Sequence, residues 1–136
     1  MTETENSVVE KRELKAVNPS DYVGIPFKIM GRDREGLDCA GLVALYLGER
    51  GYKISADDGK GEYGYDWVKQ DPERLREGVE KSGEVVEDVY DLRPDDILYF
   101  DIAGEGHVGV YNGYGKFLQI TENSKSHIAH MHGKWG

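Results

Sequence analysis

The clearest helix in the sequence is predicted within Asp38-Cys39-Ala40-Gly41-Leu42-Val43-Ala44-Leu45-Tyr46-Leu47-Gly48-Glu49-Arg50-Gly51. Apolar side chains recur in it at helical spacing and form one wide stripe: Leu42, Val43, Leu45, Tyr46 and Leu47. Asp38 can cap the start of this helix, and Gly51 stands where a C-terminal glycine is common. A stripe of this width indicates a helix that lies in the core.

The sequence pattern predicts further helices on both sides of this one. Residues 7–17 read as a weak amphipathic helix, and the cap and proline of Asn18-Pro19 open a short turn. Residues 55–70, rich in Gly, Asp and aromatic residues, read as a loop. Asp71-Pro72 starts a second helix by the same logic, with Leu75 and Val79 pointing inward.

After Gly83 the pattern changes to strands. We expect strands over 97–100, 108–111 and 116–120, with a glycine-bearing hairpin turn at 112–115 and a last strand over 127–131. Helices followed by an antiparallel sheet predict an α+β fold. The chain of 136 residues has the length of one domain, so we predict a single domain over 1–136 with an N-terminal extension over 1–17.

Composition excludes several classes of function. With 17 Lys and Arg against 26 Asp and Glu, the formal charge is −9, which argues against nucleic-acid binding. The longest apolar run, 40–48, is too short to cross a bilayer, so no membrane insertion is expected. Residues 1–6 have neither the basic start nor the apolar stretch of a signal peptide, which predicts a cytoplasmic location at synthesis.

Cys39 is the lone cysteine, and its place in the first helical turn suits a nucleophile. Free backbone N–H groups and the helix dipole stabilise a thiolate there, which predicts a thiol pKa below its usual value of about 8.5. A nucleophilic cysteine needs a base, and His107, between Gly106 and Val108 at the head of a strand, is the candidate. Strand alternation can bring Gln119 of the next strand beside His107. The alternative is a buried cysteine with a solvent-facing histidine.

Three segments resemble the NlpC/p-sixty family of papain-like cysteine peptidases, which cut bacterial cell walls. The nucleophile segment is Pro26–Val43, the strand before the histidine is Pro94–Phe100, and the histidine hairpin is Gly106–Gln119. Residues 22–27 and 31–34 look more like members encoded in phage tail gene clusters, which implies virion association and other phage tail proteins as partners. The resemblance covers about residues 20–120.

Carried over residue by residue, Cys39 matches the nucleophile, His107 the general base and Gln119 the third polar position, where the family usually has histidine. The resemblance implies hydrolysis of peptidoglycan stem peptides between D-glutamate and the diamino acid, without a cofactor. Predicted substrate-binding residues are Phe27, Asp38, Tyr63, Tyr65 and Trp67, although Asp38 also suits a helix cap and the three aromatics could equally form a packed lid.

Two positions depart from the family pattern. Phe27 stands where most members have a tyrosine whose hydroxyl faces the active site, and Met30 replaces the first of two glycines. A missing oxyanion donor costs on the order of 10²–10³ in rate elsewhere. A tail-assembly module of the same fold without useful activity is therefore the alternative function, and an acyltransferase or amidase with the same Cys–His pair is a third.

Other polar clusters are read as structural. His127, His130 and His132 form a histidine-rich run that we interpret as an exposed terminal strand rather than a zinc site, so no metal is predicted. The Asp57-Asp58 and Asp95-Asp96 pairs are read as loop and turn residues. Whether Gln119 or one of the terminal histidines orients His107 stays open at this point.

Overall fold

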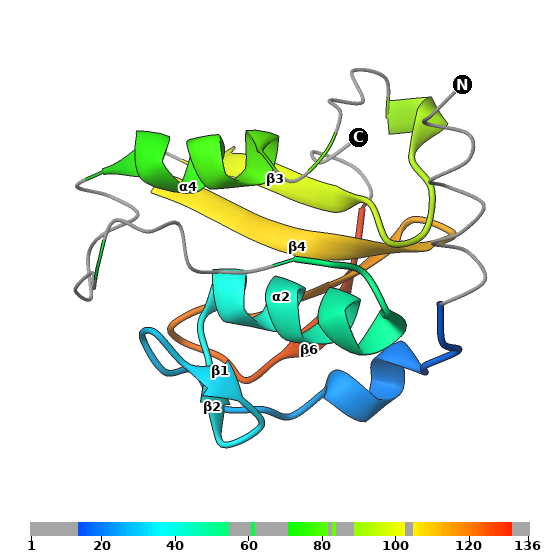
Figure 1. Ribbon diagram of the computed structural model, residues 1–136, viewed down its shortest axis with the longest axis horizontal. Helices are drawn as coiled ribbons and strands as arrows, with labels where there is room; N and C mark the ends of the chain where they lie inside the picture. Colours follow the sequence, from blue (N-terminus) through cyan, green and yellow to red (C-terminus); the bar gives the residue numbers. More distant parts are fainter. Residues whose placement is uncertain are drawn as a thin grey trace.

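The protein has two layers, a pair of helices packed on a four-stranded antiparallel sheet (Figure 1). The computed structural model describes residues 14–54, 61, 71–81, 83, 89–102 and 105–131. The sheet consists of β3 (Ile97–Ile102), β4 (Glu105–Gly113), β5 (Lys116–Gln119) and β6 (His127–His130), in that spatial order. Each strand pairs with the next one in the chain, so the predicted helices-then-sheet arrangement is confirmed.

The core helix begins and ends where the sequence predicts. Helix α2 (Cys39–Arg50) is capped by the Asp38 carboxylate, which accepts a hydrogen bond from the Gly41 N–H. Gly51 ends it in the left-handed region, at φ 111°, where a side chain would be strained. Upstream, η1 (Pro19–Tyr22) is the predicted short turn, capped by Asn18.

The second helix, α4 (Pro72–Glu80), is likewise confirmed, with Asp71 as its cap. Leu75 is buried and Val79 half-buried, so both point into the core as predicted. The hairpin between β4 and β5 turns at Tyr114 and Gly115, whose φ angles of 54° and 73° are both positive, as a tight two-residue hairpin turn requires.

Two features differ from the sequence prediction. Residues 14–17 are irregular rather than helical, and the rest of the predicted helix over 7–17 lies outside the described residues. A small hairpin not predicted from sequence, β1 (Arg32–Asp33) with β2 (Gly36–Leu37), precedes α2. Its strands have two residues each, too short for a hydrophobic period to show in sequence. A short turn η2 (Val89–Asp91) leads into β3.

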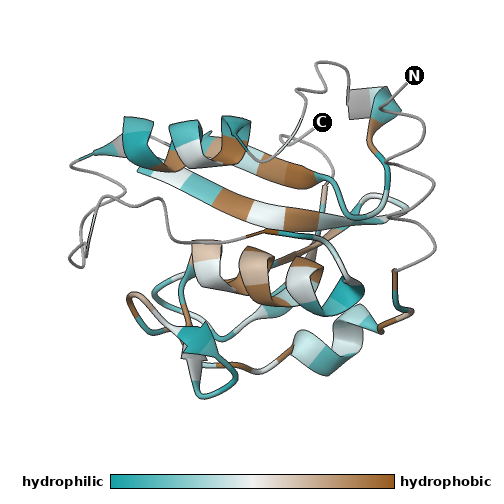
Figure 2. Cartoon of the chain, in the orientation of Figure 1, coloured by the Kyte–Doolittle hydropathy of each residue, from teal (hydrophilic) through white to brown (hydrophobic). Residues whose placement is uncertain are grey.

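The hydrophobic core lies between the helices and one face of the sheet (Figure 2). Side chains of both layers are almost fully buried there: Leu37, Leu42, Val43, Leu47, Val108, Val110, Leu118 and Ile120. Because α2 crosses β4, the first turn of the helix meets β4 near His107. Burial of this apolar surface therefore holds the two predicted catalytic elements together.

Polar contacts stabilise the end of α2 and the start of β6. At the end of α2, Arg50 pairs with Asp95 at 2.5 Å, and Tyr52 donates a hydrogen bond to the same carboxylate. The buried Ser126 hydroxyl donates to the Tyr22 carbonyl and accepts from the Ile25 N–H, tying η1 to the start of β6. Among the described helices, none has both the length and the apolar character to span a bilayer.

Candidate active site

Asp38 holds the first turn of α2 in place. Its Oδ1 accepts from the Gly41 N–H at 2.8 Å and from Arg32 at 3.0 Å, while Oδ2 accepts from the Met30 N–H at 3.0 Å. The carboxylate is 1% exposed and its oxygens are occupied by these partners. It therefore caps the helix as predicted, while substrate binding by Asp38 stays a prediction.

The first helical turn is packed tightly against the chain before it. A Cβ on Gly41 would lie 2.1 Å from the Gly31 carbonyl oxygen, closer than atoms can approach. Gly31 in turn lies against Gly36 of β2, where a Cβ would come within 2.2 Å of the carbonyl oxygen. The position of the residue next to Asp38, Cys39, is therefore fixed by backbone contacts.

His107 and Gln119 lie together as strand alternation predicts. His107 Nε2 is 2.8 Å from Gln119 Oε1. Since a carbonyl oxygen only accepts, Nε2 carries the proton and Nδ1 is the ring nitrogen left to act as base. Phe100 stacks on the imidazole, with ring centroids 5.8 Å apart. This contact and the amide fix the plane of the ring.

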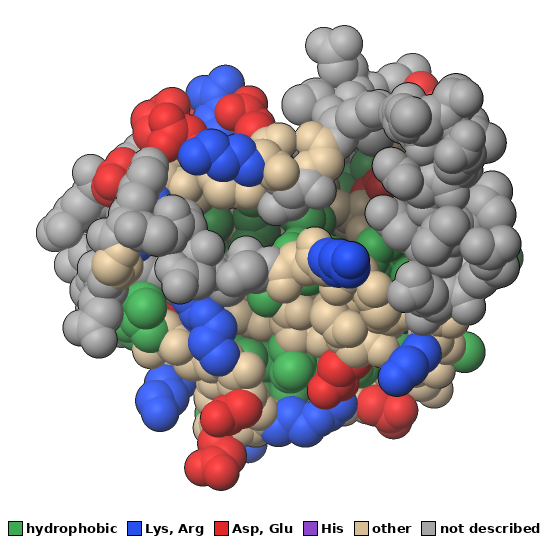
Figure 3. Space-filling view, in the orientation of Figure 1, with side chains coloured by type: hydrophobic (Ala, Val, Ile, Leu, Met, Phe, Trp, Pro, Cys, Tyr) green, Lys and Arg blue, Asp and Glu red, His purple; other side chains and the backbone are tan. Residues whose placement is uncertain are grey.

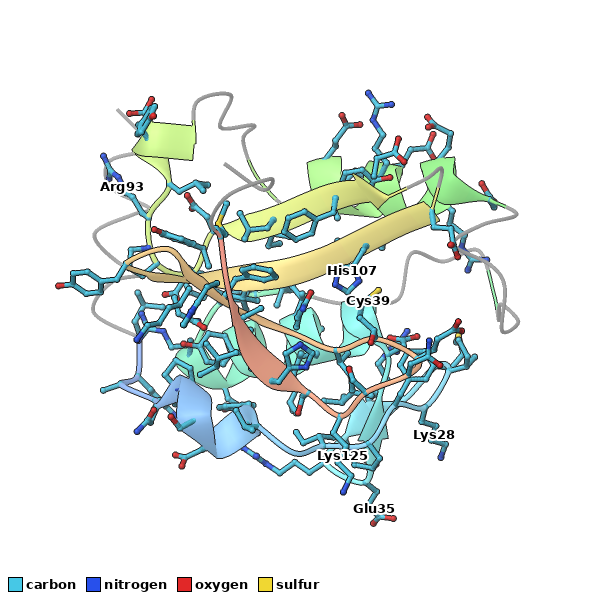
Figure 4. The ribbon with its side chains drawn as sticks, turned by 180° about the vertical axis from the view of Figure 1, so that it is seen from behind. Lys28, Glu35, Cys39, Arg93, His107 and Lys125 are labelled. Carbon is cyan, nitrogen blue, oxygen red and sulfur yellow. The ribbon has the colours of Figure 1, made fainter. Side chains whose placement is uncertain are left out.

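Cys39 and His107 lie next to each other, the first from the start of α2 and the second from β4 (Figure 4). The Cys39 sulfur also receives a hydrogen bond from the backbone N–H of Val108, the residue after His107. The structure thus brings the three predicted catalytic residues into one contiguous group.

The predicted acidic thiol is not what the structure shows. The pKa of Cys39 is raised to about 12, mainly by burial and in addition by the negative charge of Asp38. The backbone N–H groups of Val108, Ala40 and Cys39 lower the pKa but do not compensate. Burial outweighs the stabilisation of the thiolate by the helix start, because Cys39 is only 7% exposed and a buried thiolate loses its hydration.

His107 is also shifted towards its neutral form. Burial lowers the pKa of its imidazole, as does charge on His127, while the hydrogen bond to Gln119 raises it. A neutral thiol thus faces a neutral imidazole. For the predicted nucleophile to attack, the thiol proton has to pass in the same step to His107, the predicted general base.

The other predicted site residues have different positions. Phe27 is half-buried against the core and bridges Leu37, two residues before Cys39. Tyr63, Tyr65 and Trp67 lie outside the described residues. Asp95 is bound to Arg50 at the far end of α2, which agrees with its structural reading.

The environment of His127 differs from the sequence prediction. His127 is half-buried, and its Nε2 lies 3.0 Å from Gln119 Nε2, so it is not simply a residue of an exposed strand. His130 is exposed, and His132 lies outside the described residues. Within the described part of the chain, no group of three or more His, Cys, Asp or Glu residues could hold a metal ion.

A shallow groove of about 360 Å³ runs along α2. It is lined by Arg32, Gly41, Ala44, Leu45, Gly48, Glu49 and Ile54. Figure 3 shows acidic and basic side chains interspersed on the face of the molecule where α2 lies. No charge of one sign gathers among the described side chains of that face.

Comparison with known proteins gives matches of one kind. The model of the NlpC/P60 family matches residues 24–135. The gamma-DL-glutamyl hydrolase of Bacillus subtilis (strain 168) is 28% identical over 116 residues, a match that covers 81% of this chain and 23% of that protein. The chain therefore spans less than a quarter of the length of this curated relative.

Two solved structures share the fold. The NlpC/p60 domain of the peptidoglycan hydrolase SagA has a TM-score of 0.54 at 21% identity, covering 84% of this chain and 90% of that one. An NlpC/P60 family protein from Bacillus cereus ATCC 10987 has a TM-score of 0.60 at 19% identity, covering 88% of this chain and 37% of that one. At these identities the likeness concerns the fold, and the predicted papain-like α+β class is confirmed.

Proposed function

This chain belongs to the NlpC/P60 family, and from that premise we propose that it is a cysteine peptidase that hydrolyses peptide bonds in peptidoglycan stem peptides. The observation that carries the proposal is the group formed by Cys39, His107 and Gln119, with the imidazole bonded to the amide at 2.8 Å. The name of the curated relative, a gamma-DL-glutamyl hydrolase, supports a γ-linked glutamyl residue in the substrate.

The reaction would proceed through a thioester. The Cys39 sulfur attacks the substrate carbonyl carbon while His107 Nδ1 takes the thiol proton, and backbone N–H groups at the start of α2 stabilise the oxyanion. The C–N bond then breaks, and the imidazolium gives its proton to the leaving amine. Water, deprotonated by His107, hydrolyses the thioester and regenerates the thiol.

A digest of purified peptidoglycan tests this function. We expect the protein to release peptides with new D-glutamyl carboxyl termini, identified by mass spectrometry, and Cys39→Ala to release none. Because Cys39→Ala removes a small side chain, its stability should stay within about 1–2 kcal/mol of the wild type. Release of the same peptides by folded Cys39→Ala would contradict the nucleophile assignment.

A second candidate function is a structural module of the same fold without useful activity. Phe27 and the buried, weakly acidic thiol favour it, because both reduce the expected rate. Phe27→Tyr distinguishes the two: on the peptidase proposal a hydroxyl at this position raises kcat. Intact peptidoglycan after incubation with both the wild type and Phe27→Tyr would favour the structural module.

Association with a phage tail, with other tail proteins as partners and a virion location, stays a prediction. It depends on the resemblance of residues 22–27 and 31–34 to tail-cluster members. Co-purification of the protein with intact virions of a phage that encodes it would support this association.

A further inference from the structure

The chain of side-chain contacts that starts at His107 does not end at Gln119. The Gln119 Nε2 atom lies 3.0 Å from His127 Nε2, and His127 Nδ1 lies 2.9 Å from the Lys125 carbonyl oxygen. Gln119 of β5 and His127 of β6 are paired directly across the two strands. The register of the sheet therefore holds them in contact.

The proton positions in this chain follow from its last member. The Lys125 carbonyl can only accept, so His127 Nδ1 donates to it. Neutral His127 then has a bare Nε2, which accepts from the Gln119 NH2 group. This turns Gln119 Oε1 towards His107, which must donate from Nε2. The bare nitrogen of His107 is Nδ1, the one needed to take the Cys39 proton.

We propose that His127 is a positioning residue: it sets the orientation of the Gln119 amide and thereby keeps His107 in the tautomer that can accept the Cys39 proton. The proposal rests on the proposed peptidase function only for its effect on turnover. The proton positions themselves are a property of the folded chain.

Protonation of His127 reverses this order. A second N–H at Nε2 would face the Gln119 NH2 group, so the amide has to turn over and offer Oε1 to His127. Its NH2 group then faces His107 Nε2, which becomes an acceptor. The proton of neutral His107 moves to Nδ1, and the ring can no longer accept a proton from Cys39.

Other titratable residues lie on β6 and on the elements that pack against it. They are His130 on β6, Lys116 on β5, and Asp21 and Tyr22 on η1. Tyr22 is engaged elsewhere, since its hydroxyl donates to Glu49. His107 faces His127 through Gln119, and charge on His127 lowers the pKa of His107. The charge states of the two histidines are therefore coupled, with Gln119 between them.

The test compares kcat and KM on a stem peptide for His127→Leu, His127→Gln and the control His130→Leu, which changes an exposed histidine of the same strand. We expect His127→Leu to lower kcat about tenfold with little change in KM, because the amide is then free to turn. His127→Gln offers an acceptor near the place of Nε2 and should recover most of kcat. His130→Leu should behave as the wild type.

A double-mutant cycle tests whether the effect passes through Gln119. In a Gln119→Ala background, His127→Leu should have no further effect on kcat. An equal loss in both backgrounds would overturn the proposal, and so would a loss of kcat in His127→Gln as large as in His127→Leu. Thermal unfolding of each variant identifies any loss of kcat that comes from misfolding.

The imidazole ¹⁵N shifts provide a readout that needs no hydrolysis. We expect His107 as the Nε2–H tautomer and His127 as the Nδ1–H tautomer when both rings are neutral. The opposite tautomer on either ring would overturn the proposal. If the tautomers are as expected but no peptide is cleaved, the peptidase function fails and the proton order stands.

Discussion

The two halves of the candidate site are held by different kinds of force. The start of α2 is fixed by backbone contacts, with Gly41 against the Gly31 carbonyl and the Asp38 carboxylate bound on several sides. The histidine side is fixed by a row of neutral hydrogen bonds from His107 through Gln119 to His127. The first arrangement sets where an atom lies, and the second sets where a proton lies.

This difference matters because the two halves fail in different ways. A change at the start of α2 should both move the Cys39 sulfur and lower the free energy of unfolding. A change along the histidine row should leave the fold intact and alter the protonation of the base.

The largest effect is expected for Gly41→Ala. Its Cβ would lie 2.1 Å from the Gly31 oxygen, so the first turn must shift. We expect a loss of about 1–3 kcal/mol in the free energy of unfolding, as for an overpacked core, and loss of activity through displaced Cys39. Denaturant unfolding and the peptide digest measure both effects.

Gly48→Ala is the matched control on the same helix. A Cβ there meets nothing within 4 Å, so alanine should stabilise the helix by about 0.5–1 kcal/mol. Opposite signs for the two substitutions would confirm that packing, not helix propensity, decides at Gly41. If Gly41→Ala were as stable as Gly48→Ala, the first turn would not be sterically fixed.

Asp38→Asn tests the charge beside the sulfur. The amide can still cap the helix, but the ion pair with Arg32 is lost, and because Arg32 is 33% exposed we expect a cost of about 1–3 kcal/mol. The pKa of Cys39 should fall, since the negative charge of Asp38 raises it. The pH dependence of Cys39 alkylation measures this change.

Asp33→Asn, at an exposed aspartate of β1, is the control for Asp38→Asn. It should leave both the stability and the alkylation profile unchanged. An alkylation profile that is the same in the wild type and in Asp38→Asn would mean that the Asp38 charge does not act on the thiol.

The parts of the fold that could be predicted from sequence are those with local causes. Helix α2 follows from the Asp38 cap, its apolar stripe and Gly51, and α4 from its cap and proline. The antiparallel sheet of β3 to β6 follows from short apolar strands and a glycine-bearing turn. By contrast, the β1–β2 hairpin and the ion pair between Arg50 and Asp95 depend on contacts made only after folding.

The site was predictable in its members but not in its energetics. Alternation along β4 and β5 was enough to predict that Gln119 would meet His107. The pKa of Cys39 was predicted with the wrong sign, because burial is a property of the tertiary structure and outweighs the helix start. The contact of His127 with Gln119 could have been found only from the register of β6, which one sequence does not reveal.

Burial of the thiol predicts a loss of stability at alkaline pH. The pKa of Cys39 rises from 9.0 to about 12 on folding, so between these values the folded chain keeps a proton that the unfolded chain has lost. Stability is therefore complete below pH 9 and falls as the pH rises, by up to about 1.4 kcal/mol per unit for one group.

Comparing the wild type with Cys39→Ala isolates this contribution. Tyr22 and Tyr52 also have a pKa raised to about 12, but both remain in the two proteins. The slope of unfolding free energy against pH should be shallower in Cys39→Ala above pH 9. Parallel slopes would show that the thiol is no more buried in the folded chain than in the unfolded one.

The smallest effect expected is a shift of the acidic limb of kcat/KM, which reports the protonation of the base in the free enzyme. Gln119→Glu places a negative charge beside His107, which favours the imidazolium, so the limb should move to higher pH by about one unit. Gln119→Ala removes the hydrogen bond that raises the pKa of His107, so the limb should move to lower pH.

Opposite shifts from one position separate a proton effect from a packing effect. Both variants disturb the same contact. If Gln119 acted through packing alone, the acidic limb of kcat/KM would stay in place in both variants or move in the same direction in both. The unfolding free energies should change far less than for Gly41→Ala, because the row of neutral bonds lies beside the core and adds little to it. If the acidic limb shifted in the same direction in both variants, one distinction would fail: that backbone contacts place the Cys39 sulfur whereas hydrogen bonds set the protonation of His107.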